Sequence, residues 1–233
     1  MLDIEGTTSS TWFVHDTLYP YSRAHFERYI VEHASESLVE EQLEAVRQLI
    51  DEPDADRARI VEQLNAWLDA DEKVTPLKAL QGWIWRDGFA KGELTSHFFD
   101  DAIPAIRQWH DEGRTLFIFS SGSVTAQHAW FGHSPDGDLL PLFTDHFDTE
   151  NIGPKRIAAS YAKISAAIGF EPAQTIFLSD LVAELDAARE AGWNTVGVQR
   201  AGDQHFDKGV GDHLAISAFD QLDLGQVPPT RVA

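Results

Sequence analysis

The chain has 233 residues, of which 43% are hydrophobic and 24% charged, a composition that can bury a core in one large domain or two small ones. Its formal charge of −20 disfavours nucleic acid or an anionic membrane as a partner, yet allows a small anionic substrate where a bound cation reverses the local charge. The absence of cysteine excludes disulfides, thiolate metal sites and cysteine nucleophiles.

The chain begins with a short apolar and acidic segment, Met-Leu-Asp-Ile-Glu, which continues into Gly-Thr-Thr-Ser-Ser. This start lacks the apolar core of a signal peptide. No hydrophobic run in the chain approaches the roughly 20 residues of a membrane span. We therefore expect a soluble, cytoplasmic protein.

From about residue 21 to residue 113 the pattern is helical. One apolar stripe has helical spacing, and its members are Ile60, Val61, Leu64, Trp67 and Leu68. Pro53 and Pro76 are expected to divide this region into separate helices.

In the second half of the chain, short apolar runs alternate with helical stretches. The runs at 115–121, 175–180 and 194–199 have the length and continuous apolarity of strands that are buried on both faces. Helical patterns follow the first two runs, at 123–131 and 181–191. Strands that alternate with helices indicate βαβ units, so the sequence predicts an α/β fold with a doubly wound, Rossmann-like parallel sheet.

These patterns together predict an α/β core that is interrupted by an all-helical insert just after its first strand. We place the core at residues 1–15 and 105–233 and the insert at 16–104.

Polar side chains follow three predicted strands at the points where the strands end. Asp3 follows the first strand, Ser120 and Ser121 close the second, and Asp180 closes the third. In open α/β sheets ligands bind beyond the carboxyl ends of the strands, so these side chains should converge in space. Taken alone, each has an ordinary explanation: an acid in a turn of an acidic chain, or a serine that caps a helix.

The order of these features resembles the haloacid dehalogenase-like superfamily, whose motifs are an Asp-x-acid start, a strand-terminal Ser or Thr, a Lys and a strand-terminal acid pair. Glu5, where Asp is usual, and the continuation Asp-Ile-Glu-Gly-Thr-Thr-Ser look like the enolase-phosphatase family in particular. Three further stretches match that family, at 80–85, 120–124 and 147–155. The resemblance extends from Asp3 to about Val198.

The resemblance implies an aspartyl-phosphate mechanism. Asp3 would be the nucleophile, and the Glu5 side chain would be the general acid and base. One Mg²⁺ per chain would bind the Asp3 carboxylate, the Glu5 backbone carbonyl and the Asp180 carboxylate. Glu184 would lie near Asp180 as an outer ligand or orienting group.

The remaining implied roles concern the substrate. Ser120 and Ser121 would hold the phosphoryl oxygens, Lys155 would neutralise charge on the nucleophile and the phosphate, and Trp85 would face the substrate from the helical cap. The alternatives remain open, because Lys155 can be a surface lysine in a first helical turn and Trp85 can be core of the insert.

The implied function is that of a bifunctional enolase-phosphatase of methionine salvage, an acireductone synthase type of phosphoric monoester hydrolase. It would convert 2,3-diketo-5-methylthiopentyl 1-phosphate into 1,2-dihydroxy-3-keto-5-methylthiopentene and phosphate, as a monomer whose partner is a small-molecule phosphate. Alternatives are a phosphatase of the same fold that acts on another sugar or keto phosphate, a metal-independent dehalogenase, and a non-catalytic acidic module.

One feature departs from the superfamily pattern, in which several apolar residues of a full central strand precede the nucleophile. Here only Met1 and Leu2 precede Asp3, whereas a strand usually has about five residues. We therefore expect native residues upstream of Met1, and restoring them should raise stability. An upstream reading frame without apolar codons would count against this expectation.

Overall fold

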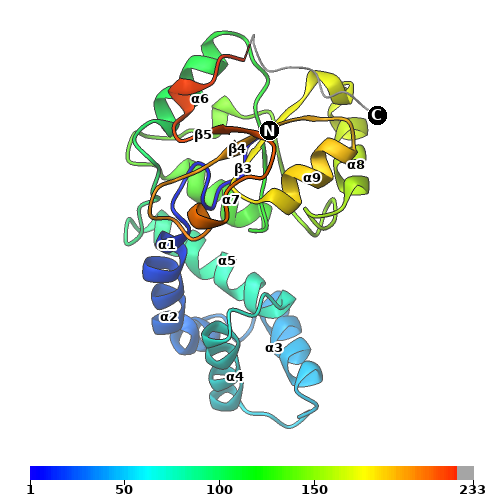
Figure 1. The fold of residues 1–233 in the computed structure, drawn as a ribbon. Coiled ribbons are helices and arrows are strands. Elements are labelled where there is room, and N and C mark those ends of the chain that lie inside the picture. The colour runs from blue at the N-terminus through cyan, green and yellow to red at the C-terminus, as the bar shows by residue number, and fades with distance from the viewer. Residues whose placement is uncertain (225–233) are drawn as a thin grey trace. The chain divides into compact units, whose positions relative to one another are not determined.

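The computed structural model describes residues 1–224, which form two compact units. The core unit comprises Met1–Phe13 and the described residues from Ser96 onward, and the helical unit is Val14–Thr95. Figure 1 shows the parallel sheet of the core unit and the four long helices of the helical unit. The predicted boundary between residues 104 and 105 falls inside helix α6, Ala102–Asp111, which lies entirely in the core unit.

The core unit is built on a parallel sheet, which confirms the predicted α/β class. Its strands are β1 (Phe117–Phe119), β2 (Asp145–Phe147), β3 (Ile176–Ser179), β4 (Asn194–Val198) and β5 (Leu214–Ile216). One part of the sheet pairs β1 with β2, and the other has the order β3-β4-β5. Leu2 forms parallel bridges with Ile118 and Leu178, so the N-terminal residues join the two parts.

Three of the five strands lie within the predicted apolar runs, and the other two were not predicted. The missed strands have the sequences Asp-His-Phe in β2 and Leu-Ala-Ile in β5, and each has at least one exposed residue. Such three-residue segments are too short to stand out in the sequence, and neighbouring strands and helices supply the burial that holds them in the sheet.

The core unit also contains the helices α1 (Thr11–Phe13), α6, α7 (Val124–Gly132), α8 (Ala158–Ile168) and α9 (Val182–Glu190). Of these, α7 packs against β2, and α9 packs against β3 and β4. Between the sheet and helices α8 and α9, Tyr161 lies with its ring centroid 5.5 Å from that of Phe119 and 5.4 Å from those of Phe177 and Trp193. These edge-to-face contacts fill the layer beneath the functional residues and fix the strands that carry them.

The helical unit has a core of its own. Its elements are a π-helical turn (Val14–Leu18), α2 (Tyr19–Glu32), α3 (Ser37–Leu49), α4 (Arg57–Asp69) and α5 (Thr75–Ala90). Four members of the predicted stripe are buried in α4, with Val61 partly buried, and Pro76 lies in the first turn of α5, where it is tolerated. In the described part of the chain, no helix combines the length and apolarity that a membrane crossing requires.

The N-terminal ammonium lies inside the sheet. It donates to the carbonyl oxygen of Ile176 at 3.0 Å, and burial lowers its pKa from 8.0 to about 5. A groove of about 440 Å³ opens at this point, lined by residues that include Thr115 and Leu116 before β1 and Thr175 before β3. An extended apolar segment joined to Met1 would therefore lie between the backbone segments that lead into β1 and β3.

Adding four apolar residues before Met1 should raise the free energy of unfolding by about 2–4 kcal/mol. Since the folded amine has the lower pKa, the parent loses stability as pH falls from 8 to 5, and the gain should be largest at the acidic end of that range. Urea unfolding at several pH values measures it.

A Gly-Ser-Gly-Ser extension is the matched control, because it moves the charge without filling the groove. Equal gains from both extensions would assign the effect to the charge alone, and no gain from either would contradict the prediction.

Candidate active site

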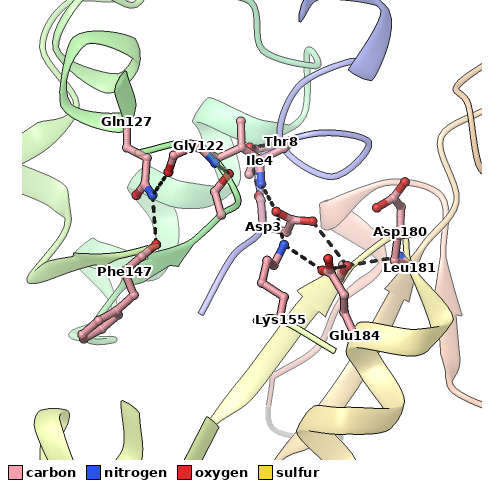
Figure 2. Close-up of polar contacts among 12 residues, drawn as sticks. Asp3, Ile4, Thr8, Gly122, Gln127, Phe147, Lys155, Asp180, Leu181 and Glu184 are labelled. Carbon is pink, nitrogen blue, oxygen red and sulfur yellow. Dashed lines mark hydrogen bonds and ion pairs between the residues drawn. The ribbon is translucent and has the colours of Figure 1, made fainter. Parts of the chain in front are cut away.

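Four of the predicted functional residues, Asp3, Lys155, Asp180 and Glu184, lie close together in the core unit (Figure 2). Lys155 Nζ lies 2.6 Å from Asp3 Oδ1 and 2.7 Å from Glu184 Oε2. Asp3, Lys155, Glu184 and Asp180 are all at least 93% buried. Residues from three separate segments of the sequence therefore form one charged cluster inside the core unit.

Both the backbone and the side chain of Lys155 make contacts that fix its position. The Tyr161 hydroxyl donates to the Lys155 backbone carbonyl at 2.7 Å, and the ammonium lies within 6 Å of the ring centroids of Phe119 and Phe177. The pKa of Lys155 is raised although burial lowers it, because Asp3 and Glu184 favour the charged ammonium. Lys155 is thus a fixed buried cation, which excludes the alternative of a surface lysine.

The turn after Asp3 fixes its carboxylate. The backbone N–H of Ile4 donates to Asp3 Oδ1 at 2.8 Å, and the Thr8 hydroxyl donates to the Asp3 carbonyl at 3.1 Å. Gly6 has φ +68°, and a Cβ atom there would lie 2.2 Å from Asp180 Oδ2. Only glycine fits, so the turn brings the Asp180 carboxylate directly against the backbone that follows Asp3.

The cluster holds more acidic than basic groups. Asp3, Asp180 and Glu184 supply three carboxylates against the one ammonium of Lys155. Burial raises the pKa of Asp3, and burial followed by the charge of Glu184 raises the pKa of Asp180 to about 7. Buried carboxyl oxygens from an excess of acidic groups are a donor set that suits a hard divalent cation.

Ser120 and Ser121 lie in the loop that joins β1 to α7. Ser120 is buried, and its Oγ accepts a hydrogen bond from the Gly122 N–H at 3.2 Å, whereas Ser121 is partly exposed. The cap of α7 is Ser123, whose Oγ accepts from the Ala126 N–H. Helix capping therefore does not account for Ser120 and Ser121.

Two predicted residues lie outside the buried cluster. Glu5 belongs to the turn after Asp3 and is partly exposed. Trp85 lies in α5 of the helical unit, where its indole N–H donates to the Leu18 carbonyl at 2.9 Å. A substrate contact by either side chain stays a prediction.

Sequence reasoning missed two polar neighbours of the cluster. The fully buried Ser179 hydroxyl lies 3.0 Å from Glu184 Oε2 and 3.4 Å from Asp3 Oδ2, and His205 Nδ1 lies 2.7 Å from Asp180 Oδ2. Ser179 directly precedes Asp180 at the end of β3, a position that could have drawn attention to it. His205 belongs to no pattern that singles it out.

Comparisons with known proteins agree with this geometry. A haloacid dehalogenase-like hydrolase family matches residues 1–192. An enolase-phosphatase E1 from Streptomyces avermitilis is 53% identical over 226 residues, which cover 97% of this chain and 95% of the relative. Another, from Pseudomonas fluorescens, is 46% identical over 223 residues, which cover 96% of each.

A solved structure resembles both units as well. The crystal structure of the UTR4 protein from Saccharomyces cerevisiae has a TM-score of 0.78 at 30% sequence identity, and the likeness covers 95% of this chain and 97% of that chain. The similarity therefore extends through the helical insert as well as the sheet.

Proposed function

The chain belongs to the enolase-phosphatase E1 family of haloacid dehalogenase-like hydrolases, and from this premise we propose that it turns 2,3-diketo-5-methylthiopentyl 1-phosphate into an acireductone and phosphate. Phosphatase activity in methionine salvage follows from the family. The observation that carries the proposed chemistry is the buried Asp3 carboxylate, held 2.6 Å from Lys155 directly after Leu2, which bridges β1 and β3.

The proposed hydrolysis has two displacements at phosphorus. The Asp3 carboxylate attacks phosphorus, the bond from phosphorus to the substrate oxygen breaks, and Glu5 donates a proton to that oxygen. Glu5 then takes a proton from water, which attacks the aspartyl-phosphate, so that phosphate leaves and Asp3 is restored. The fixed backbone turn after Asp3 supports this assignment, because an in-line attack needs a carboxylate that does not move.

We assign one Mg²⁺ to the carboxylates of Asp3 and Asp180 and the backbone carbonyl of Glu5. The excess of acidic groups and the oxygen donors of the cluster support this assignment. When bound, the ion would neutralise the repulsion between the nucleophile and the phosphoryl group. Lys155 would supply a second positive charge next to Asp3.

Substrate recognition is divided between the units in this proposal. Ser120, Ser121 and the backbone N–H groups before α7 hold the phosphoryl oxygens. The helical unit acts as the cap, with Trp85 facing the substrate, and the base of the enolisation is either Glu5 or a residue of the cap. The enzyme would work as a cytoplasmic monomer, and its mass in solution tests the monomeric state.

The test is to follow phosphate release and the ultraviolet absorbance of the acireductone together, with Mg²⁺ and with a chelator. We expect both signals to rise at equal rates and to vanish with the chelator. Phosphate release without the absorbing product, or faster release from another sugar phosphate, would indicate a simple phosphatase. Activity that the chelator leaves unchanged would contradict the metal assignment, and no release would favour a non-catalytic module.

A further inference from the structure

The buried side-chain amide of Gln127 forms a hydrogen bond with the loop between β1 and α7. Gln127 lies in the first turns of α7, and its side chain, in a residue that is 1% exposed, extends back past the start of the helix (Figure 2). Its Nε2 donates to the carbonyl of Gly122 at 2.8 Å and to the carbonyl of Phe147 at 2.9 Å. The side chain therefore joins the loop to the end of β2.

Both the nitrogen and the oxygen of this amide group have hydrogen-bond partners. Since Nε2 donates both of its protons to carbonyls, Oε1 is the acceptor, and it lies 3.1 Å from His146 Nδ1. That acceptor fixes the proton of His146 on Nδ1, because burial lowers the pKa of the imidazole to about 4 and keeps it neutral. The Phe147 carbonyl also accepts from the Ser120 N–H at 3.1 Å, so Gln127 binds where the β1–β2 ladder ends.

The bond to Gly122 determines where the loop directs its next amide. The peptide unit between Gly122 and Ser123 is planar and trans, so the Ser123 N–H points to the side opposite the Gly122 carbonyl. In Figure 2 that carbonyl points toward Gln127, and Asp3 lies on the other side of the loop. Gln127 thus orients this peptide unit with its N–H directed away from Gln127 itself, to the side of the loop on which Asp3 lies.

A second buried side chain fixes the neighbouring amide. Asp148, which follows β2, accepts the Val124 N–H at 2.9 Å through Oδ2. This bond engages the N–H of Val124, the first residue of α7. Gln127 therefore acts on the preceding peptide unit, between Gly122 and Ser123.

We propose that Gln127 is a positioning residue for phosphoryl binding, which acts by holding the Gly122–Ser123 peptide with its N–H toward the phosphoryl group. This inference rests on the proposed function of the loop. Gln127 itself does not touch the substrate. The competing explanation is a buried polar group that only stabilises the core, and it predicts a loss of stability with no change in phosphate affinity.

The test uses Gln127→Met, which keeps the length of the side chain and removes the amide. The probe is inorganic phosphate, measured as a competitive inhibitor in the presence of Mg²⁺, beside the KM and kcat of the substrate. We expect the inhibition constant of phosphate to rise about tenfold and kcat to fall about tenfold or more, since a misdirected donor stabilises the transition state less.

The matched control is Ser165→Ala. It removes the buried hydrogen bond from the Trp193 indole, 2.8 Å long, which lies in the α8 layer and not in the loop. This variant should lower the melting temperature yet keep the phosphate inhibition constant within about twofold of the parent.

The outcomes separate the two proposals. If the parent binds phosphate and Gln127→Met binds it equally well, the positioning role is wrong while the proposed function stands. An equal loss of phosphate affinity in Ser165→Ala would assign the effect to general destabilisation. A parent with no affinity for phosphate would overturn the phosphoryl site and this inference together. If Gln127→Met does not fold, Gln127→Glu, which keeps the size but cannot donate when ionised, takes its place with the same expectations.

Discussion

Replacing Asp3 with asparagine is expected to lower kcat for phosphate release by at least about 10³-fold while the fold stays intact. An amide oxygen can still accept the bonds from the Ile4 N–H and from Lys155, but a neutral amide does not attack phosphorus. Because burial raises the pKa of Asp3, loss of its charge should leave the melting temperature unchanged or higher. Steady-state kinetics and thermal unfolding on the same samples measure both effects.

Detection of a covalent phosphoryl group on Asp3 distinguishes a nucleophilic role from a purely electrostatic role of this carboxylate. The parent, quenched in acid during turnover, should yield a peptide with a phosphoryl group on Asp3, and Asp3→Asn should yield none. Asp136→Asn is the matched control, since it makes the same chemical change on an exposed residue of the core unit. Substantial turnover by Asp3→Asn, or a phosphoryl group on another residue, would contradict the assignment.

The charged cluster could be predicted in part because a parallel sheet gathers its strand ends at one edge. Asp3 follows the bridge residue Leu2 and Asp180 follows β3, so their convergence follows from the predicted parallel sheet. Lys155 ends no strand, and its place next to Asp3 depends on the turn before α8 and on Tyr161 beneath it. Sequence reasoning could name Lys155 only through the family resemblance.

The contacts that surround the cluster could not be predicted, since they depend on distant segments. His205 reaches Asp180 across 25 positions of sequence, and Gln127 reaches Phe147 across 20. No spacing rule connects such pairs, because their distances are fixed by how helices and loops pack around the sheet. An apolar run in the sequence predicts a strand only where both of its faces are buried. The strands β2 and β5 have exposed residues and were therefore not predicted.

Replacing Lys155 with methionine should have the largest effect on stability, a loss of about 3–5 kcal/mol in the free energy of unfolding at pH 7. Methionine keeps much of the apolar stem that packs near Phe119 and Phe177, but it leaves the carboxylates of Asp3 and Glu184 buried without their cation. Urea unfolding in the presence of a chelator measures the loss.

The pH dependence identifies the cause of that loss. Burial places the pKa values of Asp3 and Asp180 above those of the unfolded chain, so both groups favour folding below pH 4 and lose this contribution as pH rises. For Asp180 the loss is complete above its folded pKa of about 7. Without Lys155 this loss grows, and the deficit of the variant should therefore be greatest near pH 7 and should shrink toward pH 4. Added Mg²⁺ should restore part of the stability at neutral pH, because it replaces part of the missing positive charge.

Lys163→Met is the matched control, because Lys163 donates from the surface of α8 to the Ile152 carbonyl and belongs to no buried ion pair among the residues described. Its loss should stay within about 0.5 kcal/mol at every pH. If the deficit of Lys155→Met were equally large at pH 4 and pH 7, the missing packing of the side chain, and not its charge, would explain the loss. The excess of acidic groups would then be balanced in the folded protein by groups other than Lys155, and the argument for a cation at Asp3 and Asp180 would lose its electrostatic support.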